Sequence, residues 1–245
     1  MDINRIVALD SVKEALKSIV SNKELYTRCN VKPNHVIFSG LSAGNGRTTV
    51  CNLITDSFIE NRIVTCLELD QSIELKPDGK TKERLDKMFT EIENCSVYSN
   101  HYSGLIFINL DGITPYATQD HISDFISELE NVAKYATLFF FIESGSRNAE
   151  ILIKKIKSAL VNVDTVEVSP YSVEELAEIT SLMLEDHCIE VDEITKAIIC
   201  EIIANRQMKT ANECVYLRNE LVKFANFETG NIVLSMSELR KSMFN

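Results

Sequence analysis

The chain has 245 residues, 45% of them hydrophobic, so it is long enough to bury a core without disulfides or metals. Its net charge of −11, from 36 acidic and 25 basic residues, predicts a surface that repels nucleic acid and anionic membranes. No apolar stretch approaches the roughly 20 residues of a membrane span, and the N-terminus lacks a signal-peptide pattern. Seven cysteines without a C-x-x-C pair favour a reducing cytoplasm.

The first two thirds of the chain alternate between helix-like and strand-like segments. An amphipathic helix is expected at 10–28, and further helices are expected at 47–61, 81–94 and 119–135. Short apolar runs lie between them, at 36–40, 63–69, 104–110, 136–144 and 163–169. Near-continuous apolar runs separated by helix-length connections indicate an α/β domain with a parallel sheet buried on both faces.

The pattern changes at Pro170, after which no strand-like run stands out. Three helical segments follow, at 172–187, 192–206 and 210–227, and the first opens with the capping-box pair Ser172 and Glu175. The sequence therefore predicts two domains, an α/β domain over 1–168 and a small all-helical domain over 169–245.

A glycine-rich loop follows the apolar run at 36–40 and precedes the helix expected at 47–61. A loop in this position presents backbone N–H groups and a helix N-terminus to an anion, as in the phosphate-binding pattern G-x-x-x-x-G-K-[ST]. The expected phosphate-binding residues are Gly44, Asn45, Gly46, Arg47, Thr48 and Thr49. Two departures are visible: arginine replaces the lysine, and the first glycine of the pattern falls on Leu41, one residue after Gly40.

Four segments in the right order resemble an AAA+ ATPase module of the CbxX/SpoVK type, the group that includes the red-type Rubisco activases. They are IVALDSVKEAL (6–16), HVIFSG…GNGRTTV (35–50), GLIFIN (104–109) and SPYSVEELAEI (169–179). The resemblance implies a P-loop domain with a five-stranded parallel sheet flanked by helices, a helical lid, a hexameric ring and ATP-driven remodelling of a partner protein.

Several positions depart from what that family uses for chemistry. Asn109-Leu110 stands where the resemblance implies an aspartate-glutamate pair for magnesium and water, and leucine cannot act as a base. Segment 154–168 has no counterpart of the arginine that would reach a neighbour's nucleotide. Pro77, ahead of Gly79, replaces the aromatic residue of the pore loop, and a simple turn is the favoured interpretation there.

The residues that could still contact a metal are Thr48, Asn109 and Asp111. In an extended strand Asp111 would face the same side as Asn109, which leaves open a rescue by the shifted aspartate. Polar residues Ser144, Ser146 and Asn148 match sensor positions or simply form a polar loop. In the lid, the family's arginine falls on Cys214 or Val215, and Arg218, one turn later, is interpreted as an exposed cation.

Taken together, these losses indicate a degenerate, non-hydrolysing pseudo-ATPase that acts as a protein-binding or assembly subunit. ATP or ADP with Mg is expected to bind weakly at most. The partner is expected to be a protein, such as an active AAA+ relative, and the chain alone is expected to be a monomer or low oligomer. The alternative is an active AAA+ ATPase in which Gly44, Gly46, Arg47 and Thr48 bind ATP and Asp111 contacts the metal. A DNA-replication role is disfavoured by the charge.

Overall fold

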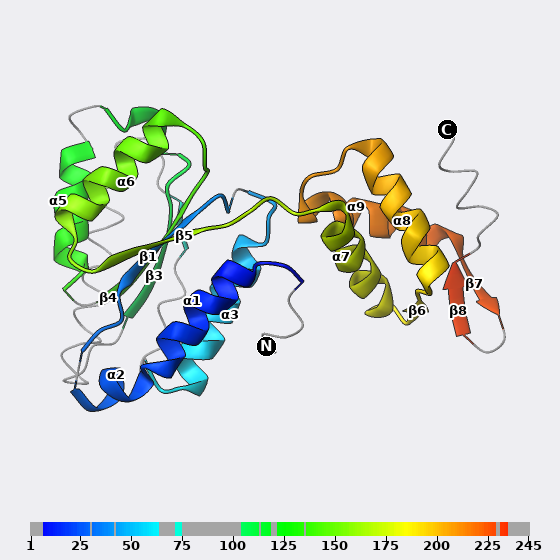
Figure 1. Ribbon diagram of the computed structural model, residues 1–245, viewed down its shortest axis with the longest axis horizontal. Coiled ribbons are helices and arrows are strands. Elements are labelled where there is room, and N and C mark those ends of the chain that lie inside the picture. The colour runs from blue at the N-terminus through cyan, green and yellow to red at the C-terminus, as the bar shows by residue number, and fades with distance from the viewer. Residues whose placement is uncertain are drawn as a thin grey trace. The chain divides into compact units, whose positions relative to one another are not determined.

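The computed structural model describes residues 7–29, 31–41, 43–63, 72–74, 104–112, 114–118, 122–134, 136–228 and 231–234. The chain divides into two units (Figure 1). The first comprises Leu9–Ser42 and Arg47–Ser169. The second consists chiefly of Pro170–Asn245, and it also takes in the short loop segment Ala43–Gly46.

A parallel sheet forms the centre of the first unit, with strand order β2-β3-β4-β1-β5. The strands are β1 (His35–Ser39), β2 (Ser72–Glu74), β3 (Gly104–Asn109), β4 (Ala136–Ile142) and β5 (Val163–Glu167). The central strand β4 is buried along its whole length, which explains why its sequence reads as one apolar run. The predicted α/β class with a parallel sheet is therefore confirmed. The strand expected at 63–69 lies outside the described residues, apart from Ile63.

Helices cover both faces of this sheet (Figure 1). Helices α1 (Asp10–Ser21) and α3 (Arg47–Glu60) pack together on one face. Helices α5 (Ile122–Val132) and α6 (Arg147–Ala159) pack together on the other. The helix expected at 81–94 lies outside the described residues.

The helix predicted at 10–28 is in fact two helices, α1 and α2 (Lys23–Cys29), separated by Asn22. The Asn22 backbone N–H donates to the Ile19 carbonyl at 3.0 Å and its side chain donates to the Ser18 carbonyl at 3.0 Å. An asparagine side chain that bonds to local backbone in this way competes with the helix ladder, which explains the break.

Alternate side chains of the strands build two different cores. On the α3 face, aromatic rings lie side by side across neighbouring strands, and Phe58 of α3 meets Phe139 edge-on at 5.8 Å. The ring pairs on the strands join Phe38, Phe107, Phe139 and Phe141. The opposite face buries mostly aliphatic residues of β1, β3 and β4, together with Phe140, against α5 and α6. Alternation along each strand places the two sets on opposite faces.

The second unit contains helices α7 (Val173–Glu185), α8 (Glu193–Arg206) and α9 (Ala211–Leu221). It also contains a sheet of order β6-β8-β7, made of β6 (Ile189–Glu190), β7 (Ala225–Glu228) and β8 (Asn231–Leu234). The prediction of an all-helical domain is therefore wrong. Helix α9 ends at Leu221, a short turn over Val222–Phe224 follows, and β7 pairs antiparallel with β8.

Helices α7 and α9 both begin with a capping box, at Ser172–Glu175 and at Thr210–Glu213. Each pair satisfies backbone N–H groups that a helix start leaves without intrahelical acceptors, so the sequence fixes where each helix begins. None of the described helices is long and apolar enough to cross a membrane.

Candidate functional site

The loop between β1 and α3 lies at the carboxyl edge of the parallel sheet. Gly44 and Gly46 have φ values of 84° and 83°, in the left-handed region that glycine adopts without steric cost. Gly40 also has a positive φ, of 100°, and a Cβ there would lie 2.2 Å from the Val168 carbonyl oxygen. Close packing against the end of β5 therefore requires glycine at position 40. This requirement is separate from the phosphate-binding pattern, whose first glycine would fall on the next residue.

Two carbonyl groups at the tip of this loop accept hydrogen bonds from residues of the second unit, to which the tip itself belongs. The Asn212 N–H, near the start of α9, donates to the Gly44 carbonyl at 3.0 Å, and the Tyr171 hydroxyl donates to the Asn45 carbonyl at 3.3 Å. Burial, with smaller contributions from Glu175 and Cys214, raises the pKa of Tyr171 to about 12. Tyr171 therefore stays a neutral donor at physiological pH.

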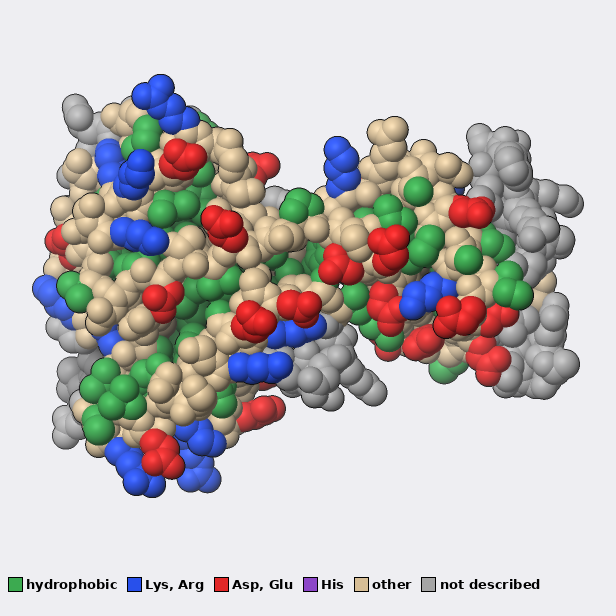
Figure 2. Space-filling model, viewed as in Figure 1, with side chains coloured by type: hydrophobic (Ala, Val, Ile, Leu, Met, Phe, Trp, Pro, Cys, Tyr) green, Lys and Arg blue, Asp and Glu red, His purple; other side chains and the backbone are tan. Residues whose placement is uncertain are grey.

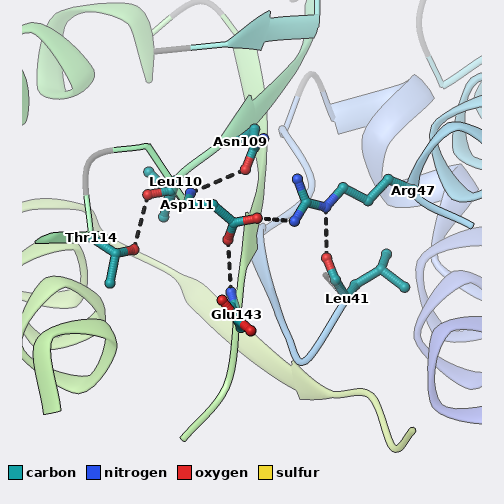
Figure 3. Close-up of polar contacts among 7 residues, drawn as sticks. All are labelled: Leu41, Arg47, Asn109, Leu110, Asp111, Thr114 and Glu143. Atoms are coloured by element: carbon teal, nitrogen blue, oxygen red, sulfur yellow. Dashed lines mark hydrogen bonds and ion pairs between the residues drawn. The ribbon is translucent and has the colours of Figure 1, made fainter. Parts of the chain in front are cut away.

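Arg47 opens helix α3 and holds two acceptors with one guanidinium group (Figure 3). Its Nε donates to the Leu41 carbonyl at 2.7 Å, and its Nη2 forms an ion pair with Oδ2 of Asp111. The Arg47 and Asp111 side chains are only 15% and 26% exposed. The residue in the place of the phosphate-binding lysine is therefore already paired with a carboxylate of the same chain.

Asp111 lies in a turn beyond the end of β3, and three contacts fix its position (Figure 3). Oδ2 faces Arg47, Oδ1 accepts the Glu143 N–H at 2.9 Å, and the Asp111 N–H donates to Oδ1 of Asn109 at 3.1 Å. The expectation that Asp111 would follow Asn109 in an extended strand is wrong, because β3 ends at Asn109. The turn nevertheless brings Asp111 to Arg47.

No family model matches the chain, and no curated protein matches it. Among solved structures, the chain is similar to PCH-2 of C. elegans, an AAA+ ATPase, with a TM-score of 0.60 and 10% sequence identity. The match covers 99% of this chain and 68% of the PCH-2 chain. The chain shares its fold with that structure. At 10% identity the likeness carries the fold alone, and it does not test the resemblance to the CbxX/SpoVK group.

Two of the three expected metal ligands, Asn109 and Asp111, have side-chain oxygens that already accept hydrogen bonds. Each carboxylate oxygen of Asp111 has a donor, and Asn109 Oδ1 accepts the Asp111 N–H. Thr48 is exposed, Thr49 is half-buried, and the described residues contain no group of three acidic, histidine or cysteine side chains that could hold a metal. Magnesium at nucleotide sites keeps several waters and takes one or two carboxylates plus phosphate oxygens, so here it would have to share the Asp111 carboxylate with Arg47.

The position expected for a catalytic base is apolar and buried. Leu110 is fully buried, and its N–H donates to the Phe141 carbonyl at 2.8 Å. Its own carbonyl accepts the Thr114 hydroxyl at 2.9 Å. Leu110 is thus part of the core between the sheet and helices α5 and α6, and its side chain offers no proton acceptor.

The sensor-type residues have structural contacts. Ser146 is the N-cap of α6, and its hydroxyl accepts the Ala149 N–H at 3.1 Å. Ser144 is exposed and Asn148 is half-buried. Arg218, expected to be an exposed cation, is half-buried instead, and its Nη1 lies 2.5 Å from Nε2 of His187.

Sequence reasoning missed the groups that surround Arg47 and the loop tip. The Leu41 carbonyl, the Glu143 N–H and the Asn212 N–H are backbone groups, which carry no sequence signal of their own. Tyr171 belongs to the segment SPYSVEELAEI, but its contact with Asn45 joins residues far apart in the chain.

Proposed function

We propose that this chain is a non-hydrolysing AAA+-fold module that serves as a protein-binding or assembly subunit. The observation that carries the proposal is the ion pair between Arg47 and Asp111, with Nε of the same guanidinium donating to the Leu41 carbonyl. The main cation of the phosphate loop is thereby neutralised within the chain. We further propose, from its sequence motifs, that the chain is a degenerate relative of the CbxX/SpoVK group.

Phosphoryl transfer depends on charges positioned around the transferred group, and the loss of one such charge commonly costs about 10²-fold or more in rate. Here Asn109 is neutral, Leu110 is buried and apolar, and residues 154–168 contain no arginine. An arginine in place of the lysine changes both the shape and the donor geometry of the loop. These losses act together, so turnover is not expected.

Weak nucleotide binding remains compatible with the loop. Gly44 and Gly46 keep the backbone conformation of a phosphate cradle, and Arg47 keeps the positive charge. ATP or ADP would have to compete with Asp111 for that charge, and magnesium would find the oxygens of Asn109 and Asp111 already accepting hydrogen bonds. The expected role of nucleotide is therefore structural at most.

The surface of the second unit favours a protein partner over nucleic acid. Acidic side chains outnumber basic ones on α7, α8 and the segment between them (Figure 2). The exposed acidic residues there are Glu174, Glu185, Asp186, Glu190, Asp192, Glu193 and Glu201. This surface would repel a phosphate backbone and complement a protein that presents lysine or arginine. An active AAA+ relative in a mixed assembly is the proposed kind of partner.

The second candidate function is an active AAA+ ATPase in which Asp111 contacts the metal. One observation favours it: the turn after β3 brings Asp111 beside Arg47. In that function the ion pair would open when Mg·ATP binds.

Light scattering of the purified chain, with and without ATP and magnesium, tests the proposed assembly role. We expect a monomer or low oligomer under both conditions, because segment 154–168 offers no arginine to a neighbour's nucleotide. A mixture with an active AAA+ relative is expected to give a larger assembly that contains both chains. An ATP-induced homohexamer would contradict the proposal.

A further inference from the structure

We propose that Asp111 is an internal competitor for phosphate, so that a terminal phosphate group binds the loop by displacing the Asp111 carboxylate from Arg47. This inference rests on the proposed function, in which the loop binds nucleotide weakly and without turnover. It assigns a regulatory contact to the same site and predicts that the acidic residue weakens binding. A metal-binding role for Asp111 predicts the opposite effect in the presence of magnesium.

The contacts of Arg47 allow such an exchange without moving the whole side chain. Nε is held by the Leu41 carbonyl within the loop, while Nη2, at the far end of the guanidinium, faces Asp111 (Figure 3). A guanidinium is a planar fork that binds carboxylates and phosphates through similar pairs of donors. The Leu41 contact can therefore persist while the outer nitrogens change their acceptor.

Asp111 is held near Arg47 by contacts that do not involve Arg47. Oδ1 accepts the Glu143 N–H at 2.9 Å, and the Asp111 N–H donates to Oδ1 of Asn109. A carboxylate fixed in this way competes at a high effective concentration, as any tethered ligand does. When a phosphate displaces Asp111 from Arg47, the Asp111 charge stays close to the phosphate. The two negative charges then repel each other in a half-buried environment.

The competition also selects a class of ligand. An acceptor with more negative charge than a carboxylate is needed to take the guanidinium, so a terminal phosphate of a di- or triphosphate should displace Asp111 better than a neutral group does. Tripolyphosphate and ATP are therefore the expected ligands, whereas adenosine alone is not. The binding should not require a metal, because Asp111 and Asn109 take no part in it as ligands.

The Asp111→Asn variant tests the proposal with little structural disturbance. Asparagine keeps an Oδ1 acceptor for the Glu143 N–H and nearly the same shape, but it removes the charge that neutralises Arg47. Asp164→Asn is the matched control, because Asp164 is an exposed carboxylate on β5 that also accepts a hydrogen bond, from Asn34 at 3.0 Å. Both variants change the net charge equally.

The measurement is calorimetric titration with tripolyphosphate and with ATP, in buffer that contains EDTA. We expect Asp111→Asn to bind both ligands about tenfold tighter than the unchanged chain, equivalent to about 1.4 kcal/mol. Asp164→Asn is expected to change affinity less than about twofold, since its charge lies on the exposed surface. Adding Arg47→Ala to Asp111→Asn should remove the gain, which would show that it acts through Arg47.

Equal or weaker binding by Asp111→Asn would overturn the proposal, and so would the absence of any binding by that variant at millimolar ligand. A gain of the same size in Asp164→Asn would assign the effect to overall charge and would overturn it as well. A failure of the proposed function would give a different result. It would appear as magnesium-dependent ATP turnover that is lost in Asp111→Asn, and the affinities measured without metal would not affect that conclusion.

Discussion

Arg47 shows how one residue type changes which groups a glycine-rich loop can bind. A lysine ammonium is a compact charge that turns freely among acceptors, whereas the guanidinium of arginine is a rigid fork that can hold separate acceptors at once. Arg47 uses this geometry to bind the Leu41 carbonyl and the Asp111 carboxylate together. A single lysine nitrogen would have to reach both acceptors from one point. The pairing with Asp111 therefore depends on having arginine, not lysine, at position 47.

His35, at the start of β1, is a residue whose surroundings keep it uncharged. It is 1% exposed, and the Leu138 N–H donates to its Nδ1 at 3.0 Å. Burial, together with the nearby Lys32 charge, lowers the pKa of His35 from 6.5 to about 3. The folded chain therefore holds His35 neutral at physiological pH.

The protonation of His35 makes stability depend on pH. Because the folded-state pKa lies below the unfolded value, the unfolded chain binds the proton first as pH falls. The stability that comes from keeping His35 neutral is fully present above pH 6.5. It is lost progressively as pH falls from 6.5 toward about 3. Between about pH 7.5 and pH 5 we expect this to lower the free energy of unfolding by about 2 kcal/mol.

Urea denaturation of the unchanged chain and of His35→Asn at both pH values measures this effect. Asparagine keeps an acceptor for the Leu138 N–H but does not titrate, so the variant should lack that part of the pH dependence. Identical pH dependence in the two proteins would show that His35 does not cause it.

At the scale of elements, Gly40 joins the end of β1 to its neighbours. Its φ is 100°, and an added Cβ would lie 2.2 Å from the Val168 carbonyl oxygen. We expect Gly40→Ala to lower the free energy of unfolding by at least about 2 kcal/mol, from strain plus collision. Gly145→Ala is the control: its φ is 87°, but nothing lies within 4 Å of the added Cβ, so about 1 kcal/mol is expected. Equal losses in chemical denaturation would contradict the role assigned to Val168.

The start of α6 supports a similar test. Ser146 accepts the Ala149 N–H as an N-cap, so Ser146→Ala should cost about 1 kcal/mol of stability. Ser144→Ala, at an exposed position, should change stability by less than about 0.5 kcal/mol. If Ser146 served as a nucleotide sensor instead, its loss would weaken ATP binding and leave the midpoint of unfolding unchanged.

The elements that sequence reasoning located are those with a strong local signal. The buried strand β4 reads as a continuous apolar run, and α7 begins at a capping box. The hairpin of β7 and β8 differs from the prediction because FANF (224–227) continues the helical pattern of the segment before it. Two residues that include a glycine separate the strands, and Ile232 and Val233 are β-branched, so a hairpin signal was present in the sequence.

The candidate site was only partly predictable, for a physical reason. The glycine loop and Arg47 follow from a local pattern, and Asp111 was noted as an acid near the same strand end. The ion pair between them depends on a turn after β3 and on the register of β1 beside β4, which no local pattern determines. The backbone partners at Leu41 and Glu143 depend on the same long-range packing.

At the scale of the whole molecule, the phosphate loop belongs to both units. Residues Ala43–Gly46 cluster with the second unit, while Arg47 and α3 belong to the first. The tip is held by Asn212 and Tyr171, and the cation is held by Asp111. The carbonyl groups of the tip and the guanidinium group of Arg47 are therefore each engaged by other groups of the chain. The acidic surface of the second unit agrees with the proposed role in protein recognition.

A single-turnover assay of ATP hydrolysis, with purified chain in excess over ATP and with magnesium present, tests this account most directly. The account predicts no phosphate release above a protein-free control for the unchanged chain, for Asp111→Ala or for the surface control Asp164→Asn. Phosphate release by the unchanged chain and by Asp164→Asn that is abolished in Asp111→Ala would contradict it, and would establish Asp111 as part of a working ATPase site.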